Sequence, residues 1–327
     1  MNELVTILIF VLMFFVYIHV INHYKTSEDL EIYEMDYKDN KHLQEVCDIK
    51  QPILFEFHTS DMENISKESL EEKYGAYDVK IKDVRDYYNK SDEAGSFVVL
   101  SMQSSQNLIK SDPGSHYFSE GNEDFVEESG LYKVCKSFEN YLKPSFICQT
   151  KYDIQFGSNN TCTPMRYHMN YRQFMAVHSG KIQVKMTPWK SKKYLKPVDD
   201  YENYEFRSPI NVWNPQPDHL NEMDKLHFVE FDVNAGHVLY IPPYWWYSIK
   251  YLGENDTLLF GITYNSIMNC IAHIPDWGLY FLQQQNIKKK PARVHAIDNE
   301  DVENIEINND GEIDTMPVKL DVIVEKL

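Results

Sequence analysis

The second half of the chain is a series of short strand-like segments, and this pattern limits the fold more than any other feature. Apolar Ile182, Val184 and Met186 alternate with polar residues, which is the period of a half-buried antiparallel strand. Similar segments, separated by turn residues, predict strands at 146–156, 172–186, 228–233, 238–241, 246–251 and 257–264. Many short strands and few helices favour a mainly β fold, a double-sheet jelly roll or a barrel.

The first half mixes strand and helix patterns that would flank this β region. Strands are predicted at 51–57 and 97–102, helices at 67–74 and 123–142, and a loop at 103–122. Gly130 weakens the second of these helices. A last helix is predicted at 276–290, because Pro275 precedes it and three lysines end it.

An apolar segment from Leu4 to Ile21 contains no charged residue. At about 1.5 Å per residue its length nearly matches a hydrocarbon core of about 30 Å. A cleavable signal peptide is the alternative, but Tyr17, His19 and Val20 are bulky where a cleavage site needs small residues. We therefore expect an uncleaved single-pass membrane anchor. The flanking charges do not decide on which side of the membrane the rest of the chain lies.

The chain has 327 residues, which suits one main domain with appendages. We expect an anchor at 1–23, a linker at 24–45, the main domain at 46–286 and an acidic tail at 287–327. Within that tail, Val318–Val324 could add a strand. Richness in Asn, Lys, Ile and Tyr is typical of an AT-rich genome, such as that of a large DNA virus.

The net charge of −18 makes nucleic acid an unsuitable partner and opposes adsorption to anionic lipid. Any membrane link must therefore come from the apolar segment. No CxxC pair occurs, so neither a zinc ribbon nor a redox motif is indicated. Two interpretations remain open for the cysteines: free thiols throughout, or one disulfide between Cys148 and Cys162. The cysteines are Cys47, Cys135, Cys148, Cys162 and Cys270.

Three segments resemble motifs of the JmjC and cupin-like 2-oxoglutarate oxygenases. Thr163-Pro-Met-Arg-Tyr-His168 resembles a T-P-x-H-x-D stretch, and Gly180-Lys-Ile-Gln-Val-Lys-Met-Thr-Pro188 resembles a G-x-K strand ending in proline. The most specific segment is Ala235-Gly-His-Val-Leu-Tyr-Ile-Pro-Pro-Tyr-Trp-Trp-Tyr247, which resembles A-G-D-x-L-x-I-P-x-x-W-W-H. The resemblance covers roughly residues 45–285. It implies a double-stranded β-helix, or jelly roll, with flanking helices.

The resemblance also locates the positions at which the family binds iron(II). There, two His and one carboxylate hold the metal and leave positions open for 2-oxoglutarate and oxygen. The matching residues are Arg166 and Tyr247 for the two His, and His168 for the carboxylate. A guanidinium offers only donors, and a phenol with a pKa of about 10 binds metal only when activated. We therefore expect a degenerate site with no catalytic residue, no metal ligand and no cofactor.

The family's lysine for the 2-oxoglutarate carboxylate falls on Ile182 when Gly180 and Pro188 are kept in register. Lys181 is one residue away, and on a strand it would face the opposite side. A one-residue bulge is the alternative that would restore Lys181 to the site.

Two uses of this position remain open from the residues alone. In one, Arg166, His168 and Tyr247 form an internally satisfied polar network, for example through a bond between Tyr247 and His168. In the other, Arg166 captures the carboxylate or phosphate of an anionic small molecule. The candidate pocket for that ligand is lined by Thr163, Arg166, Tyr167, Lys181, Ile182 and Trp246.

We therefore expect a membrane-anchored, catalytically degenerate domain that acts as a binding or structural module rather than as an enzyme. The alternative is an active Fe(II)/2-oxoglutarate hydroxylase whose metal set is displaced to His168, His178 and His237. Expected partners are the membrane through residues 4–21, an anionic small molecule or a protein, and a second copy through residues 276–290. No G-x-S-x-G, P-loop, H-E-x-x-H or G-x-G-x-x-G motif is present.

Overall fold

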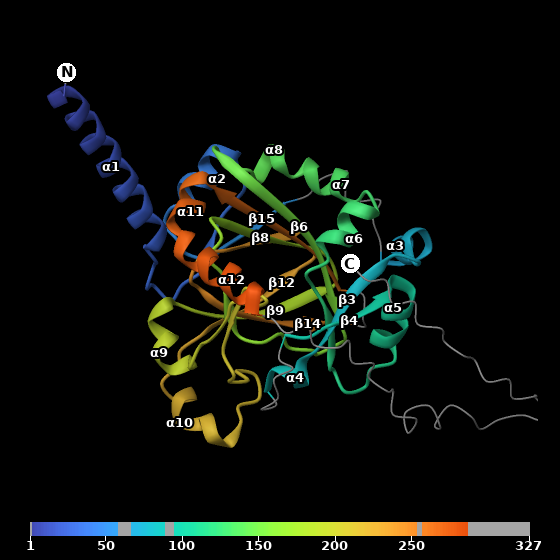
Figure 1. The fold of residues 1–327 in the computed structure, drawn as a ribbon. Helices are drawn as coiled ribbons and strands as arrows, with labels where there is room; N and C mark the ends of the chain where they lie inside the picture. Colours follow the sequence, from blue (N-terminus) through green and yellow to red (C-terminus); the bar gives the residue numbers. More distant parts are fainter. Residues whose placement is uncertain (1, 58–66, 89–94, 254–256, 287–327) are drawn as a thin grey trace, which may run out of the picture. The chain divides into compact units, whose positions relative to one another are not determined.

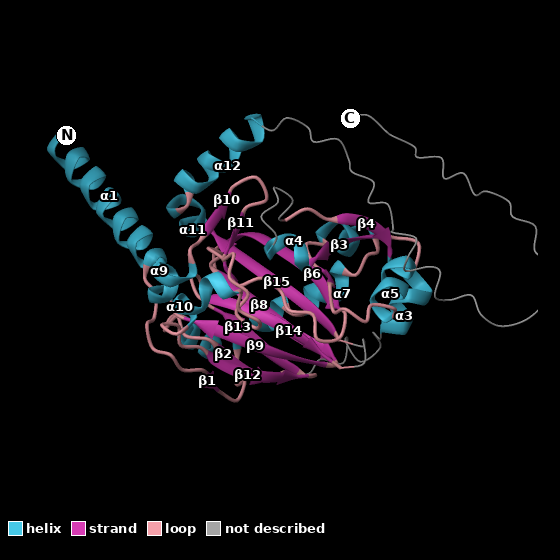
Figure 2. Ribbon diagram, turned by 90° about the horizontal axis from the view of Figure 1, so that it is seen from below, coloured by secondary structure: helices cyan, strands magenta, loops and turns pink. Residues whose placement is uncertain are grey.

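Two β-sheets form the centre of the protein, as the sequence predicted (Figures 1 and 2). The computed structural model describes residues 2–57, 67–88, 95–253 and 257–286. The larger sheet has the order β1 (Tyr33–Glu34), β2 (Ile53–Glu56), β13 (His237–Ile241), β8 (Arg172–Ser179), β15 (Leu258–Ser266), β6 (Ile147–Gly157), β5 (Tyr117–Ser119), β3 (Asp78–Asp83) and β4 (Val98–Ser101). The smaller sheet has the order β10 (Val198–Asp200), β11 (Glu205–Arg207), β7 (Arg166–Tyr167), β14 (Trp246–Leu252), β9 (Lys181–Thr187) and β12 (Val229–Asn234).

A hydrophobic core lies between the two sheets. The alternating residues Ile182, Val184 and Met186 of β9 are fully buried there against Met175 of β8 and Leu239 of β13. Because side chains on a strand alternate between faces, the polar residues of β9 stand on the outer side. The mainly β, jelly-roll-like fold is thereby confirmed.

Helices cover the other face of the larger sheet. Phe174, Tyr240 and Phe260 point to that face and pack with buried residues from α2 (Asn40–Cys47), α5 (Met102–Lys110) and the α6–α8 segment. The last segment comprises α6 (Glu123–Glu128), α7 (Tyr132–Ser137) and α8 (Glu139–Leu142). The domain also contains α3 (Lys67–Tyr74), α4 (Val84–Tyr88), α9 (Lys192–Leu195), α10 (Leu220–Met223), α11 (Ile267–Ala272), α12 (Ile274–Asn286) and two short 3-10 helices, η1 (Trp189–Ser191) and η2 (Pro217–His219).

Three expectations about local structure need correction. Residues 24–45, expected as a linker, contain β1 and the start of α2, because β1 pairs with β2 and Leu43 is fully buried. Residues 103–122, expected as a loop, contain most of α5, whose first turn is capped by Ser101. The helix predicted at 123–142 is broken into α6–α8, with Gly130 at a positive φ in the first break.

The N-terminal helix α1 (Asn2–Tyr24) is long and apolar enough to cross a membrane, and the side chains along most of its length are exposed. Its last turn packs on the domain beside α11 (Figure 1). The Tyr24 hydroxyl donates to the carbonyl of Ala272, and the rings of His23 and Tyr171 meet at 5.4 Å. The expected tail at 287–327, its strand at 318–324 and the end of the helix predicted at 276–290 lie outside the described residues.

Candidate functional site

The short strand β7 brings two of the sequence-predicted site residues together. In the smaller sheet β7 lies between β11 and β14, so Arg166 is the direct partner of both Arg207 and Tyr247. His168 follows β7, and its ring lies 6.2 Å from that of Tyr247, centroid to centroid. The three positions that match the family's metal ligands are therefore neighbours in space, although Tyr247 is far from the other two in sequence.

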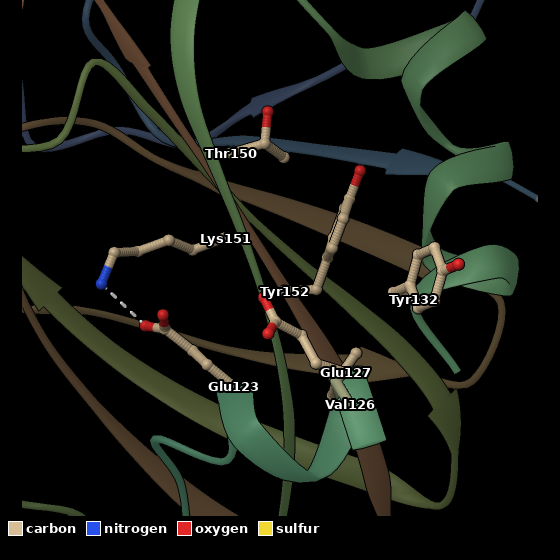
Figure 3. A pocket seen from close by; sticks show the side chains of 7 residues that line it. All are labelled: Glu123, Val126, Glu127, Tyr132, Thr150, Lys151 and Tyr152. Atoms are coloured by element: carbon tan, nitrogen blue, oxygen red, sulfur yellow. Dashed lines mark hydrogen bonds and ion pairs between the residues drawn. The ribbon is translucent and has the colours of Figure 1, made fainter. Parts of the chain in front are cut away.

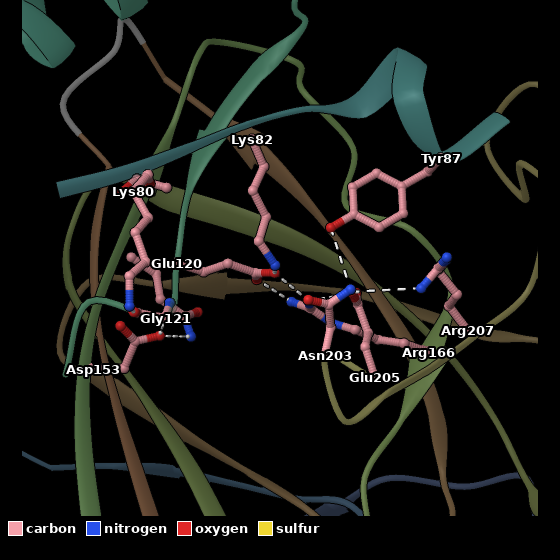
Figure 4. Close-up of polar contacts among 12 residues, drawn as sticks. Lys80, Lys82, Tyr87, Glu120, Gly121, Asp153, Arg166, Asn203, Glu205 and Arg207 are labelled. Carbon is pink, nitrogen blue, oxygen red and sulfur yellow. Dashed lines mark hydrogen bonds and ion pairs between the residues drawn. The ribbon is translucent and has the colours of Figure 1, made fainter. Parts of the chain in front are cut away.

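Arg166 is held by acidic side chains rather than left open to a ligand. Its two terminal nitrogens bond to the two oxygens of Glu120, and Nη1 lies 3.6 Å from Glu205. Glu120 also accepts from the ammonium of Lys82 at 3.0 Å (Figure 4). Arg166 is 9% exposed and Glu120 is 4% exposed, so this arrangement is shielded from water. A bidentate, doubly charge-assisted contact of this kind is the strongest geometry available to a guanidinium.

The contacts continue from Glu205 to a second arginine. Arg207 lies 3.8 Å from Glu205 and donates to Asp200 at 3.0 Å, while the Tyr87 hydroxyl donates to Glu205 at 3.5 Å. We call Lys82, Arg166, Arg207, Glu120, Asp200 and Glu205 the ion network. It contains three cations and three carboxylates, so its formal charges cancel. Buried charges are tolerated when they are paired in this way.

The pKa shifts in the ion network follow from this pairing. Burial alone would raise the pKa of Glu120, but Arg166 and Lys82 together outweigh it and lower that pKa. Burial would likewise lower the pKa of Lys82 and of Arg166, yet Glu120 reverses the direction in both. All three groups are therefore charged at neutral pH, and each stabilises the charge of its neighbours.

Both ring nitrogens of His168 are occupied. Nδ1 accepts from the N–H of Asn170 at 3.2 Å, and Nε2 lies 3.0 Å from the carbonyl of Ile241. A carbonyl only accepts, so Nε2 carries the proton and the ring is neutral. Burial lowers the pKa of His168 to about 3, and the charge of Arg166 acts in the same direction. This imidazole has no lone pair free for a metal while both bonds are in place.

Tyr247 is fixed by a different residue from the one proposed. Its hydroxyl accepts from the side-chain amide of Gln173 at 3.1 Å, whereas the sequence suggested a bond to His168. The guanidinium carbon of Arg166 lies 5.5 Å from the centre of the Tyr247 ring. The phenol therefore serves as an apolar and cation–π wall for Arg166.

The co-substrate lysine has no counterpart inside the sheets. Ile182 occupies its position and is fully buried, whereas Lys181 forms an ion pair with Asp232 at 2.6 Å on the outer side. The pairing of β9 with β12 and β14 runs through Lys181 and Ile182 without a register shift. The nearest register shift lies on β8, between Val177 and Ser179, and it leaves Lys181 on the outer side.

The other residues of the candidate pocket belong to two separate environments. Tyr167 and Trp246 pack together with ring centroids 4.8 Å apart, in an aromatic cluster that also contains Trp189 and Phe206. Thr163 instead accepts from the backbone N–H of Ile249. Because Tyr167 follows Arg166 on one strand, the two side chains face opposite sides of the sheet, so they do not line one pocket.

The arrangement does not fit an iron(II) site. The two terminal nitrogens of Arg166 and both ring nitrogens of His168 are engaged, and the buried ring of Tyr247 packs beside the Arg166 cation. His237 lies on β13 with its Nε2 3.7 Å from Glu56, so it does not join His168. Across the described ranges, no three His, Cys, Asp or Glu side chains gather in a way that could hold a metal ion.

Sequence reasoning missed the other members of the ion network around Arg166. Lys82 comes from β3, Glu120 follows β5, and Glu205 begins β11, and none of these strands was predicted. A signal was present in β3, where the buried Val79 and Ile81 alternate with Lys80 and Lys82. The short β5 and β11 offered no period long enough to be recognised.

A surface cavity of about 370 Å³ lies between α6, α7 and β6 (Figure 3). Lys151 and Glu123 form an ion pair across it at 2.9 Å. Its lining residues are Glu123, Val126, Glu127, Tyr132, Thr150, Lys151 and Tyr152. The cavity contains no residue of the ion network, so it is not the remnant of a metal site.

Comparison with known proteins agrees with this architecture. The family model described as a cupin-like domain matches residues 24–269. A JmjC domain-containing protein D from Dictyostelium discoideum is 27% identical over 99 residues. That match covers 30% of this chain and 22% of the relative, so the similarity concerns a part of each protein.

Proposed function

We propose a non-catalytic function for this chain, which belongs to the cupin-like domain family. In this proposal it is a membrane-anchored binding or structural module in which the ion network fills the position of the family's metal site. The observation that carries the proposal is the pairing of Glu120 with both Arg166 and Lys82 at that position.

Two physical arguments support loss of the metal reaction. A cation entering the site would face the guanidinium of Arg166 and would have to take Glu120 from two existing cationic partners. His168 would have to give up a backbone bond before it could coordinate. The alternative of a hydroxylase with a displaced set from His168, His178 and His237 gains no support, because these residues do not gather.

The same contacts weigh against capture of an anion by Arg166. Glu120 belongs to the same chain and is already seated on the guanidinium, so an incoming carboxylate or phosphate must displace a buried, tethered competitor. In this proposal any partner, such as another protein, binds on the outer surface and not at the former metal position.

Membrane anchoring is the second part of the proposal. The side chains of α1 are exposed along most of its length, and its end is attached to the domain by the contact of Tyr24 with Ala272. A further contact supports an anchor that is retained, because cleavage after residue 23 would remove His23, whose ring packs on Tyr171. The mass of the mature chain and its resistance to alkaline carbonate extraction from membranes test this. A soluble chain that begins beyond residue 23 would contradict anchoring.

The catalytic part is tested by metal analysis of the full chain, purified in mild detergent and incubated anaerobically with iron(II). We expect substoichiometric iron and no succinate from 2-oxoglutarate. The matched control restores the family's ligand types in one variant, Arg166→His, His168→Asp and Tyr247→His, together with Glu120→Gln to remove the unpaired acid. Stoichiometric iron in the unaltered protein, with iron-dependent turnover of 2-oxoglutarate, would refute the proposal.

A further inference from the structure

Two cysteines that are distant in sequence meet on the side of the domain where α1 packs against α11. Cys148 lies on β6 and Cys270 on α11, 122 residues apart, and their sulfur atoms are 3.4 Å from each other. The Cys148 thiol also lies 3.3 Å from the carbonyl of Asn265. A disulfide has its sulfur atoms about 2.05 Å apart, so a contact of 3.4 Å leaves little distance to close.

A β-bulge and a helix cap produce this meeting. In the pairing of β6 with β15, Gln149 faces Asn265 and Ile147 faces Ser266, so Cys148 is the extra residue on its strand. Ser266 then caps α11 by accepting from the N–H of Asn269. Cys270 comes one turn after that cap, and α11 therefore presents it to the bulged residue.

The pair is accessible, in contrast to two of the other three thiols. Cys148 is exposed and Cys270 is half-buried, whereas Cys47 and Cys135 are fully buried. The sulfur of Cys162, which the sequence suggested as a partner for Cys148, instead contacts the carbonyl of Asn160 at 3.4 Å. A small thiol reagent can therefore reach Cys148, and Cys270 is the sulfur placed to resolve the product.

We propose that Cys148 and Cys270 are a disulfide-forming pair, oxidised by exchange with a small-molecule disulfide. The thiolate of Cys148 attacks one sulfur of the reagent, forms a mixed disulfide and releases one reagent thiol. The thiolate of Cys270 then attacks the Cys148 sulfur, forms the intramolecular bond and releases the second thiol. The two cysteines lose two protons and two electrons, and the reagent disulfide is reduced to two thiols.

Cys148 is the first nucleophile for two reasons. It is the more exposed of the two sulfurs, so the reagent reaches it first. Burial, together with the neighbouring Cys148, raises the pKa of Cys270 to about 11, which leaves little thiolate at neutral pH. Cys270 therefore acts as the resolving thiol in the second, intramolecular step.

The bond would fasten the anchor to the β-domain. Helix α11 is the element on which the last turn of α1 packs, and the disulfide would join α11 directly to a central strand of the larger sheet. Closing a loop of this length restricts the unfolded chain strongly. Such a bond forms in an oxidising compartment and is reversed by reductant. This inference does not depend on whether the former metal site is silent.

The test uses the full chain in detergent, incubated with oxidised glutathione or with dithiothreitol, alkylated and digested without reduction. We expect mass spectrometry to find a peptide joining Cys148 to Cys270 after oxidation only, and Tm to rise on the order of 10 °C in a reductant-reversible way. Cys148→Ser should abolish both changes, and the matched control Cys162→Ser should keep them. Separate alkylation of Cys148 and Cys270 after oxidation, or a link to another cysteine, would overturn the pairing. A link that leaves Tm unchanged would overturn its fastening role.

Discussion

Replacing Glu120 by glutamine tests whether the ion network is the structural element that the site description implies. Glutamine keeps the size of the side chain and one acceptor oxygen but removes the negative charge. The ion network would then hold Lys82, Arg166 and Arg207 against only Asp200 and Glu205. An unpaired positive charge would remain in a shielded position between Lys82 and Arg166.

The magnitude follows from the geometry. At an effective dielectric constant of about 20, the 3.0 Å pair of Lys82 and Glu120 is attractive by about 5.5 kcal/mol. The attraction to Arg166 adds to this, and the desolvation of the carboxylate, which glutamine avoids, offsets part of the sum. We therefore expect Glu120→Gln to lower the free energy of unfolding by roughly 3–5 kcal/mol at pH 7. The corresponding fall in Tm is on the order of 10 °C.

The measurement is urea unfolding of the full chain in mild detergent, followed by tryptophan fluorescence. Trp245 and Trp246 are fully buried, so their emission reports opening of the sheets. A matched double variant, Lys82→Met with Glu120→Gln, removes a cation along with the acid and restores charge balance. It should recover most of the stability lost in the single variant.

The pH dependence gives an independent check. The pKa of Glu120 is lowered in the folded protein, so its contribution is complete above its unfolded pKa near 4.5 and is lost as the pH falls further. The difference between the unaltered protein and Glu120→Gln should therefore shrink in acid. A loss below about 1 kcal/mol at pH 7, which is typical of exposed ion pairs, would refute the description of a buried, mutually dependent network.

Three further outcomes are expected. Lys50 is buried with no hydrogen-bond partner for its ammonium among the described residues, and burial, with the charge of Arg172 next, lowers its pKa to about 8. Below pH 8 the folded protein bears the full cost of burying a charged ammonium, so Lys50→Met should raise the free energy of unfolding on the order of 3 kcal/mol. This gain should fade between pH 8 and 10.5, as measured by urea titrations at several pH values. Gly180 lies in the turn between β8 and β9 at a φ of +70°, and a Cβ there would lie 2.7 Å from the Cα of Thr257. Gly180→Ala should therefore lower the free energy of unfolding by at least about 2 kcal/mol in the same urea titration. The control Gly278→Ala, where nothing lies within 4 Å, should stabilise α12, and a loss there as large as at Gly180 would contradict the steric argument. If α12 mediates pairing of two copies, Phe281→Asp on its exposed face should reduce the cross-linked dimer in detergent, and an unchanged yield would count against α12 as the interface.

Part of the site was readable from the sequence because it depends on local pattern. The alternation in β9 decides that Ile182 faces the core and that Lys181 does not, since successive side chains point to opposite faces. The motif that ends at Tyr247 and the one that contains Arg166 resemble the two segments that carry the family's histidine ligands, and this resemblance implied that they meet. The residue types at those positions then argued against metal binding, because a guanidinium cannot ligate.

The partners of these residues required the tertiary structure. Glu120, Lys82 and Glu205 are distant from Arg166 in sequence. Of the strands that bring them in, β5 and β11 are too short to recognise by period, and the alternation in β3 does not tell which residues Lys82 meets. Their arrival depends on sheet order and register, which long-range burial sets. For this reason carboxylates of the same chain occupy the guanidinium of Arg166. From the residue types alone, an internal network and capture of an anionic ligand were both possible.

The sequence by itself determined the mainly β fold, the apolar helix at its start and the family, because period, length and motif are local properties of the chain. Only the tertiary structure decided that Arg166 is neutralised by Glu120, that Tyr247 is held by Gln173 and that Cys148 meets Cys270 rather than Cys162. Those contacts join elements far apart in the chain. They are fixed by how two twisted sheets and their helices exclude water together, not by the neighbours of any one residue.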